Sequence, residues 1–302
     1  MKRLISANAS DILNMTPQEI KQSIKASEGR VVLTEIVAQV NPYIGDITSA
    51  EIASAFGSDM ILLNGVDVFN PVIKGLKEEE QDDFVKHLKN YTGKLIGVNL
   101  EPVDTSTEML ESRNEIAIGR QANIETFEKA NELGMDFICL TGNPGVGVTN
   151  KTIVENIKIA KEHFNGLIIA GKMHGAGVNE PVLTEGVAEE IISAGADILL
   201  IPSIGTVPGV PGIRPHDIYK IVDHAHSKGA LVMSAIGTSQ ESSDSDTIKR
   251  MAIENKIAGV DIQHIGDAGY HGMAIPENIY ELSVAIRGKR HTISRIARSI
   301  NR

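Results

Sequence analysis

The residues with the most useful chemistry near a single strand end are Lys172 and His174. They close the aliphatic run GLIIAGKMHG (166–175), two positions apart. A lysine at the end of a buried strand is either paired with a carboxylate or kept near neutrality by desolvation. It can then form a Schiff base with a carbonyl substrate or act as a fixed charge toward an anion. His174, with an ordinary pKa of about 6.5, is a candidate general acid or base.

Carboxylate and amide side chains occupy the other strand ends. Glu35 and Glu101 are the further catalytic candidates, and a purely structural ion pair of Lys172 with a carboxylate is the competing interpretation. Asp67, Glu101 and Asp267 supply enough carboxylate oxygens for a magnesium site, so Mg²⁺ is the candidate cofactor. The expected substrate-binding positions are polar or glycine residues at strand ends: Asn64, Asn99, Asn143, Ser203, Ser234, Gln263, Gly237, Thr238, Gly266, Asp267 and Gly269.

Side-chain alternation predicts which of these residues point to the interior. In the run LIGVNLE (95–101) the aliphatic residues are expected to face outward, which leaves Asn99 and Glu101 pointing inward together. In the run GVDIQHIGD (259–267) the same argument puts Asp261 and Gln263 inside. It places His264 at the edge of the strand or in the loop that follows.

Strand-like and helix-like segments alternate eight times along the chain. The aliphatic runs lie at 31–35, 59–65, 94–101, 136–143, 166–175, 197–203, 230–237 and 259–267. The helical segments between and after them lie at 47–56, 78–90, 120–132, 150–163, 184–193, 215–227, 245–255 and 276–286. Eight such units could form an open doubly wound sheet, but their even spacing favours closure into a barrel.

The predicted fold class is therefore α/β, a single (β/α)₈ TIM barrel with an extra helix at each end. One domain is expected over residues 1–302. An N-terminal capping helix lies within 1–29, at about 10–26, and is expected to cover the amino-terminal mouth of the barrel. A C-terminal helix is expected within 288–302, and its basic residues, from Arg287 to Arg302, are expected to be solvated.

Composition and charge exclude several classes of partner. The formal net charge is −10, so neither nucleic acid nor an anionic membrane surface is expected as a partner. A single cysteine, Cys139, fits a reducing compartment, and the start MKRLISANASDIL lacks the apolar core of a signal peptide. A cytoplasmic protein with a small-molecule substrate is predicted, with a homo-oligomer as a possible assembly.

Glycine-rich loops follow several of the runs. The loop 203–215 has three prolines and three glycines and is a candidate lid. The loops 235–246 and 265–278 follow the last two runs, where barrels of this kind often hold a phosphate. Glu241, Asp244 and Asp246 follow the start of the first of them, and would repel a phosphate unless a metal or Arg214 compensates.

The layout resembles the phosphate-binding (β/α)₈ superfamily, with Gly237-Thr238-Ser239 and Gly266-Asp267-Ala268-Gly269 at the two cradle positions. The chain, above all IGDAGYHGMAIPENIYELSVAIRGKRHT (265–292), also resembles an uncharacterised bacterial barrel family often found with sugar-uptake genes. Some members of that family carry a haloacid-dehalogenase-like hydrolase label. The residues do not fit that hydrolase's nucleophile motif, because Asp244-Ser245-Asp246 opens a polar helix and Ile248 stands where Thr or Val is needed.

The leading functional hypothesis is an enzyme acting on a small, phosphorylated sugar or keto-acid metabolite by lyase, aldolase or isomerase chemistry. Lys172 would act as the Schiff-base or electrostatic group, with His174 or Glu101 as the proton shuttle. A metal-dependent hydrolase or lyase that uses the strand-end carboxylates is the first alternative. A non-catalytic barrel that binds a metabolite and regulates a partner is the second.

Overall fold

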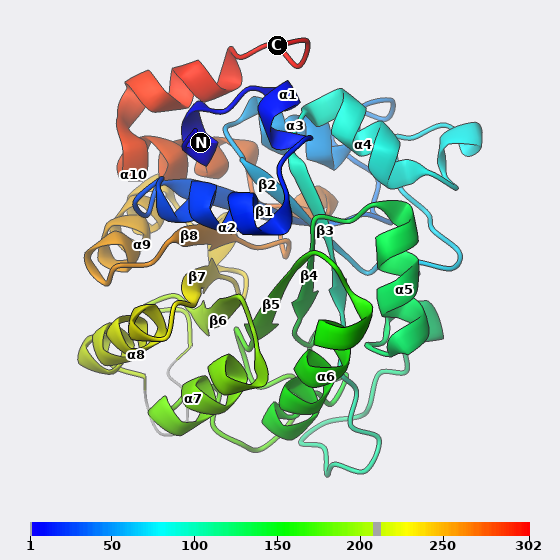
Figure 1. Cartoon of the computed structure of the whole chain (residues 1–302), viewed down its shortest axis with the longest axis vertical. Coiled ribbons are helices and arrows are strands. Elements are labelled where there is room, and N and C mark those ends of the chain that lie inside the picture. Colours follow the sequence, from blue (N-terminus) through cyan, green and yellow to red (C-terminus); the bar gives the residue numbers. More distant parts are fainter. Residues whose placement is uncertain (1, 208–212) are drawn as a thin grey trace.

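The computed structural model describes residues 2–207 and 213–302. Within them, eight parallel strands form a closed barrel in sequence order, surrounded by helices (Figure 1). The strands are β1 (Val31–Val37), β2 (Met60–Asn64), β3 (Leu95–Leu100), β4 (Phe137–Leu140), β5 (Leu167–Gly171), β6 (Ile198–Pro202), β7 (Leu231–Ile236) and β8 (Ile262–Ile265). Pairing of β1 with β8 completes the barrel, so the predicted TIM-barrel fold class is confirmed.

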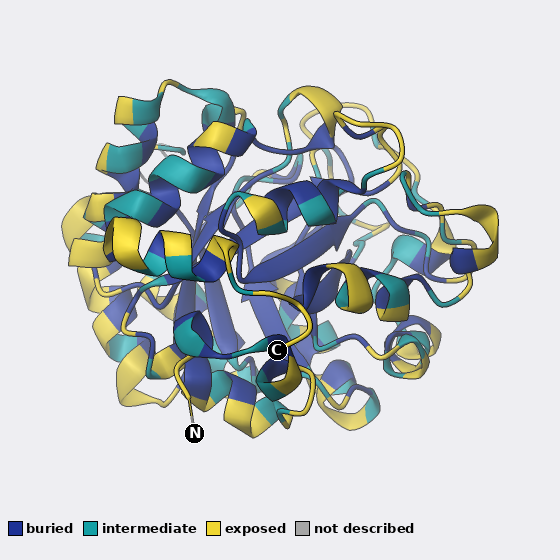
Figure 2. Ribbon diagram, turned by 90° about the horizontal axis from the view of Figure 1, so that it is seen from above, coloured by how far each residue is buried: buried dark blue, intermediate teal, exposed yellow. Residues whose placement is uncertain are grey.

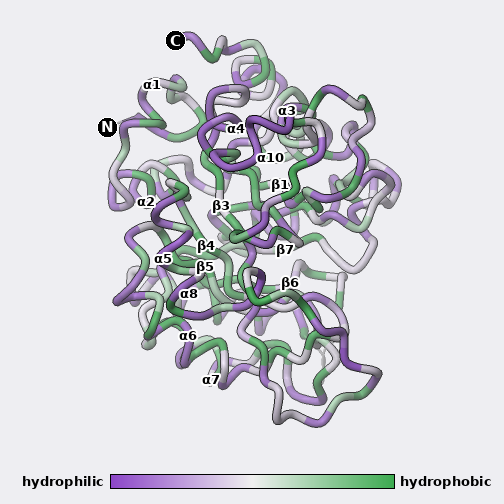
Figure 3. The backbone as a smooth tube through the Cα atoms, turned by 90° about the vertical axis from the view of Figure 1, so that its right-hand side faces the viewer, coloured by the Kyte–Doolittle hydropathy of each residue, from purple (hydrophilic) through white to green (hydrophobic). Residues whose placement is uncertain are grey.

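Two apolar layers explain why the strands are aliphatic on both faces. The inner layer fills the barrel with side chains such as Leu33, Leu62 and Ile169. The outer layer, with Ile96 and Val98, packs against the helices. The strands are almost entirely buried, and the exposed residues lie on the outer helix faces and in the loops, as Figure 2 shows. Figure 3 shows the same hydrophobic residues concentrated along the central strands.

The eight predicted outer helices are all present. They are α3 (Ser49–Ala55), α4 (Phe84–Thr92), α5 (Ile124–Leu133), α6 (Asn150–His163), α7 (Glu185–Ala194), α8 (Pro215–Ser227), α9 (Ser245–Ile257) and α10 (Pro276–Ile296). α4 starts at Phe84 rather than at Glu78, because Asp83 has a non-helical backbone conformation. In the described part of the chain, no helix is long and apolar enough to cross a membrane.

The N-terminal segment forms two helices instead of the single one expected over 10–26. α1 (Ala9–Ile12) and α2 (Pro17–Lys25) are separated where Thr16 caps α2 and Pro17 occupies its first position. Ile20 and Ile24 of α2 belong to the same apolar cluster as the inner barrel residues. The segment therefore covers the amino-terminal mouth of the barrel.

The C-terminal helix follows the last barrel helix across a kink, within the element α10. α10 runs to Ile296 and bends at Gly288, whose φ of 70° no helical residue adopts. The expectation that its basic residues are solvated is wrong for Arg287 and Arg295, which are buried against the Asp59 carboxylate. The distances are 2.5 Å from Arg287 Nη1 and 2.7 Å from Arg295 Nε. Asp59 precedes β2, at the barrel end opposite the carboxyl ends of the strands.

Candidate active site

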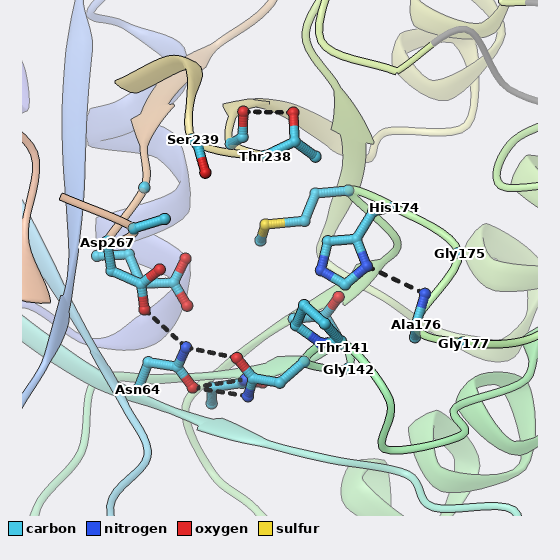
Figure 4. Close-up of a pocket in the computed structure, with 18 of the residues that line it drawn as sticks. Asn64, Thr141, Gly142, His174, Gly175, Ala176, Gly177, Thr238, Ser239 and Asp267 are labelled. Atoms are coloured by element: carbon cyan, nitrogen blue, oxygen red, sulfur yellow. Dashed lines mark hydrogen bonds between the residues drawn. The ribbon is translucent and has the colours of Figure 1, made fainter. Parts of the chain in front are cut away.

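A cavity of about 540 Å³ opens at the carboxyl ends of the strands, the end where barrels of this type place their sites (Figure 4). Its polar lining comes from seven strand ends and the loops after them: Glu35, Asn64, Asn99, Thr141, Asn143, His174, Thr238, Ser239, Glu241 and Asp267. Leu110 and Glu111 line it from the long segment between β3 and α5, and Met173 and Val178 add apolar surface. No lysine or arginine is among the described residues that line it.

An amide network forms one wall of the cavity. Asn64 and Asn143 exchange hydrogen bonds of 2.8 and 2.9 Å between their side chains, and Asn99 donates to Asn64 Oδ1 at 3.2 Å. Asn143 also donates to Glu101, from its side chain at 2.9 Å and its backbone at 2.7 Å. Asn64 Nδ2 donates to Asp267 at 2.7 Å, as Figure 4 shows. These predicted site residues are thus held in one connected arrangement.

Glu101 supports this network from below the cavity surface. It is buried, and its carboxylate accepts a hydrogen bond from Arg120 Nη2 at 2.8 Å. The inward direction predicted for Asn99 and Glu101 matches their contacts. Because both oxygens of Glu101 are already bonded to Arg120 and Asn143, its carboxylate positions amides rather than facing the cavity.

Glu35, which lines the cavity, forms a buried pair with His264. Glu35 Oε2 and His264 Nε2 lie 2.8 Å apart. The inward direction predicted for Gln263 is wrong. Ile262 belongs to the inner layer and His264 lies inside with it, while Gln263 faces the outer helix α9. The strand begins only at Ile262, and Asp261 directly before it forms a bend, so alternation cannot be counted through this residue.

The carboxyl groups of Glu35 and Asp267 have pKa values displaced toward neutrality. Burial, with the nearby Glu241 and Glu101 carboxylates, raises the pKa of Glu35 to about 8. Burial and the charge of Glu35 raise the pKa of Asp267 to about 7, against the hydrogen bond from Asn64. Burial lowers the pKa of His264 to about 4. Around neutral pH, Asp267 therefore populates both protonation states, which suits proton transfer.

His174 faces the cavity as a neutral hydrogen-bond donor. Its Nδ1 accepts the Ala176 backbone N–H at 3.0 Å, so the neutral ring carries its proton on Nε2. Burial and the Lys172 charge lower the pKa of His174 to about 4, which keeps the ring neutral. In Figure 4 the second ring nitrogen points into the cavity, across from Asp267.

Lys172, the first catalytic candidate, lies outside the cavity. It is buried, and its Nζ binds the Glu180 carboxylate, which also accepts the backbone N–H of Asn150 at the start of α6. Burial lowers the pKa of Lys172 against the opposing effect of Glu180. Its neighbour Met173 lines the cavity instead. The competing interpretation of Lys172 as a paired lysine fits this geometry, with Glu180 as a partner that the sequence did not indicate.

Three predicted substrate-binding residues lie behind the barrel wall. Ser203 donates to Asn255 of α9 at 3.0 Å, and Asn255 donates to Gln263 at 3.1 Å. Ser234 is buried and lies beside Gln263 in the β7–β8 register. None of the three lines the cavity. These polar side chains lie between the strands and α9. Their contacts are therefore structural, although each residue belongs to a strand or follows a strand end.

The three predicted metal ligands are not brought together. Asp67 accepts the backbone N–H groups of Phe69 and Asn70 at 2.9 and 3.2 Å, and it lies outside the cavity. Glu101 is engaged by Arg120, which leaves Asp267 as the one member of the trio on the cavity surface. Across residues 2–207 and 213–302, no group of three His, Cys, Asp or Glu is arranged as a metal site. The predicted trio therefore does not fit Mg²⁺.

The two cradle loops do meet at the cavity. Gly237, Thr238, Gly266 and Asp267 line it, whereas Gly269 sits in a tight turn against the Met273 carbonyl. The candidate lid at 203–215 falls partly on 208–212, outside the described residues. Asp244 caps α9 through the Asp246 and Thr247 N–H groups, as its polar helix start indicated.

Sequence reasoning gave no site role to Glu241, and it misplaced His264. Glu241 is 1% exposed, lines the cavity and lies in a short 3₁₀ turn, η4 (Gln240–Ser242). Asn278 of α10 holds this turn by donating to the Glu241 and Ser243 carbonyls. No sequence motif identifies a site residue that a 3₁₀ turn places. The one sequence feature that could have identified Glu241 is its acidic side chain next to the predicted phosphate cradle.

Replacing Glu35 with Gln should flatten the dependence of stability on pH. The folded-state pKa of about 8 exceeds the ordinary 4.5, so the folded protein holds an extra proton between these values. The resulting stability is present in full below pH 4.5 and is lost as the pH rises through about 8. The expected difference between wild type and E35Q is on the order of a few kcal/mol.

Urea unfolding at several pH values measures this difference. The exposed Glu111 on the same cavity provides the matched control, because E111Q should keep the wild-type pH dependence. An E35Q protein that loses stability with rising pH as steeply as wild type would contradict the assignment.

The fold and the position of the cavity define a (β/α)₈ barrel protein with a polar site at the carboxyl ends of the strands. A family model described as "Domain of unknown function (DUF7916)" matches residues 5–302, and the chain belongs to this family. No curated protein sequence matches it. These findings bear out the barrel part of the expected resemblance and give no link to sugar-uptake genes or to haloacid dehalogenase-like hydrolases.

Two solved structures share the fold at low sequence identity. One is a Schiff-base-forming fructose-1,6-bisphosphate aldolase, with a TM-score of 0.54 and 14% identity. The match covers 86% of this chain and 96% of the aldolase chain. The other is 2,3-dimethylmalate lyase, a PEP mutase/isocitrate lyase superfamily member, with a TM-score of 0.50 and 12% identity. That match covers 86% of this chain and 81% of the lyase chain.

Proposed function

We propose that this protein is an enzyme that removes a proton next to the carbonyl group of a small, oxygen-rich metabolite, as a lyase or isomerase does. The observation that carries the proposal is the placement of Asp267 and the neutral His174 on opposite sides of one cavity. A base with a pKa near neutrality and a hydrogen-bond donor aimed at the developing oxyanion are the two groups that enolisation needs.

The proposed reaction assigns one step to each group. His174 Nε2–H donates a hydrogen bond to the substrate carbonyl oxygen and stabilises the negative charge that develops there. The Asp267 carboxylate takes the proton from the adjacent carbon, and the C–H electron pair forms the enolate double bond. In an isomerisation, the proton of Asp267 then returns to the former carbonyl carbon, while the proton of the adjacent hydroxyl group moves to the former carbonyl oxygen and leaves a new carbonyl group behind. In a lyase reaction, Asp267 instead takes the proton of a hydroxyl group one carbon further along. That carbon becomes the carbonyl group of the released fragment as the carbon–carbon bond breaks, and Asp267 returns the proton to the enolate carbon of the other fragment.

The remaining cavity residues support this assignment. Asn64 holds Asp267 through its 2.7 Å hydrogen bond, and the Glu101–Arg120 pair fixes the amides behind it. Amide and hydroxyl groups that line the cavity suit the hydroxyl groups of a sugar-like substrate. The two similar structures are named as an aldolase and a lyase, which agrees with this reaction class by fold analogy.

Hydrogen–deuterium exchange tests the proposal even when the product of the reaction is not identified. The protein is incubated in D₂O with a panel of aldoses, ketoses and keto acids, each with its phosphorylated counterpart. Proton NMR then follows loss of the signal next to the carbonyl. Catalysed exchange of at least one panel member is expected. A ligand that binds without any exchange would instead favour the alternative of a non-catalytic metabolite-binding barrel.

Borohydride treatment with the same panel should leave no adduct on Lys172. Its Nζ is bound to Glu180 behind the cavity wall, so a carbonyl substrate in the cavity does not reach it. Intact-mass and peptide mass spectrometry measure the result. A reduced adduct on Lys172 would contradict this geometry and restore the Schiff-base hypothesis.

A further inference from the structure

The loops after β7 and β8 meet where a phosphate is commonly bound in (β/α)₈ barrels. Such a cradle works through free backbone N–H groups, often aided by a cationic side chain. Here the N–H of Gly266 donates to the Ile236 carbonyl at 2.8 Å. The N–H of Ala268 donates to Glu241 Oε1 at 2.6 Å. Two of the cradle's donors are thus already used inside the protein.

The surrounding structure holds the Glu241 carboxylate between the two cradle loops. An ideal Cβ on Gly266 would lie 3.2 Å from Glu241 Oε1, so the carboxylate lies directly against the glycine of the cradle. Asn278 fixes the backbone of the turn through bonds of 2.9 and 2.8 Å. Glu241 Oε2 is buried and has no partner among the described residues, although Glu241 lines the cavity. An unpaired buried oxygen of this kind costs free energy unless a ligand donates to it.

The surroundings of Glu241 offer no counter-charge to an anion. Asp267 and Glu35 lie at the same end of the cavity, and no lysine or arginine lines it within the described residues. Burial, with a smaller effect of the Asp267 charge, raises the pKa of the Glu241 carboxyl. A phosphate here would lose part of its hydration against the Glu241 carboxyl group without a cationic side chain beside it, and a buried charge without a partner is costly.

We propose that Glu241 occupies the place of a bound phosphate, and that the cavity takes an unphosphorylated carbonyl compound whose hydroxyl group donates to Glu241 Oε2. This inference rests on the proposed function for the carbonyl group, and it narrows the substrate class of the same site. The expected phosphorylated substrate is thereby replaced by an unphosphorylated one. The two loops of the phosphate cradle are present, but the Glu241 side chain occupies the place of the phosphate.

Binding of inorganic phosphate, measured by isothermal titration calorimetry on wild type and variants, tests the role of Glu241. Wild type should show no binding at millimolar concentrations. Glu241→Ala frees the Ala268 N–H and removes a charge, so it should bind phosphate at least about tenfold more tightly than wild type. Glu241→Gln removes the charge but keeps an acceptor for the N–H, and should gain less. It serves as the second variant if the alanine protein does not fold.

Glu111→Gln is the matched control, because it removes one carboxylate from the same cavity without touching Ala268. It should gain no phosphate binding. Phosphate binding by wild type as tight as by the variants, or no gain in either Glu241 variant, would overturn the inference.

The deuterium-exchange assay tests the proposed substrate class independently of phosphate binding. Unphosphorylated panel members should exchange faster with wild type than their phosphorylated counterparts, and the reverse order would also overturn the inference. If nothing in the panel exchanges, the proposed reaction fails, while the phosphate titration still decides whether Glu241 fills the cradle.

Discussion

Replacing Asp267 with Asn should lower catalysed deuterium exchange by at least about 100-fold, the range expected when a general base is removed. Asn has nearly the same shape and can still accept the hydrogen bond from Asn64. The substitution therefore removes the proton-accepting oxygen without collapsing the amide network. Binding of the exchanging ligand, measured separately, should change far less than the exchange rate.

Asp67→Asn is the matched control for this experiment. Asp67 also follows a strand, but its carboxylate caps the loop N–H groups of Phe69 and Asn70 outside the cavity. Exchange by the D67N protein should equal that of wild type. Undiminished exchange by a folded D267N protein would rule out Asp267 as the base and would leave Glu35 as the next carboxyl group to test.

Asp59→Asn is expected to be the most destabilising of the substitutions proposed for this protein. Asp59 is fully buried, and although burial opposes it, the Arg287 and Arg295 guanidinium groups lower its pKa. Removal of its charge leaves two buried arginines without their counter-ion. Loss of one partner from a buried ion pair costs about 3–5 kcal/mol. Chemical unfolding of wild type and D59N measures the difference in free energy.

The exposed Asp223 on α8 gives the control, since D223N removes an aspartate charge from the surface and should change stability by less than about 0.5 kcal/mol. The active-site predictions do not depend on this result, because Asp59 lies at the opposite end of the barrel. A D59N protein as stable as wild type would show that solvent or a rearranged partner compensates the arginines.

The barrel could be predicted because its signals are local and repeated. Each strand is a short aliphatic run, and several of the long helices begin or end with residues that favour those positions. Thr149 caps α6, and Gly134 and Gly195 end α5 and α7 with φ values of 78° and 112°. The two terminal helices were harder to predict. Their boundaries depend on Pro17 and on one bend at Gly288, within otherwise helical patterns.

Side-chain alternation predicted direction only within an unbroken strand. Asn99 lies inside β3 and lines the cavity, in the direction that alternation predicts, and the strand-end residues Asn64 and Asn143 line it as well. Gln263 was misplaced because the backbone bends just before β8. For Lys172, Gly171 has a φ of 148° directly before it, and the run is apolar on both faces, so its direction could not be derived.

The pairing of the first strand with the last one affects how this protein folds during synthesis. β1 forms its ladder with β8, and the N-terminal segment is held by the last residues: Arg295 donates to the Ala7 carbonyl and Arg298 to Asn8. A chain emerging from the ribosome exposes β1 and the apolar side of α2 long before these partners exist. Contacts between such distant residues form slowly. We therefore expect nascent chains to need protection from aggregation until the final helix is released.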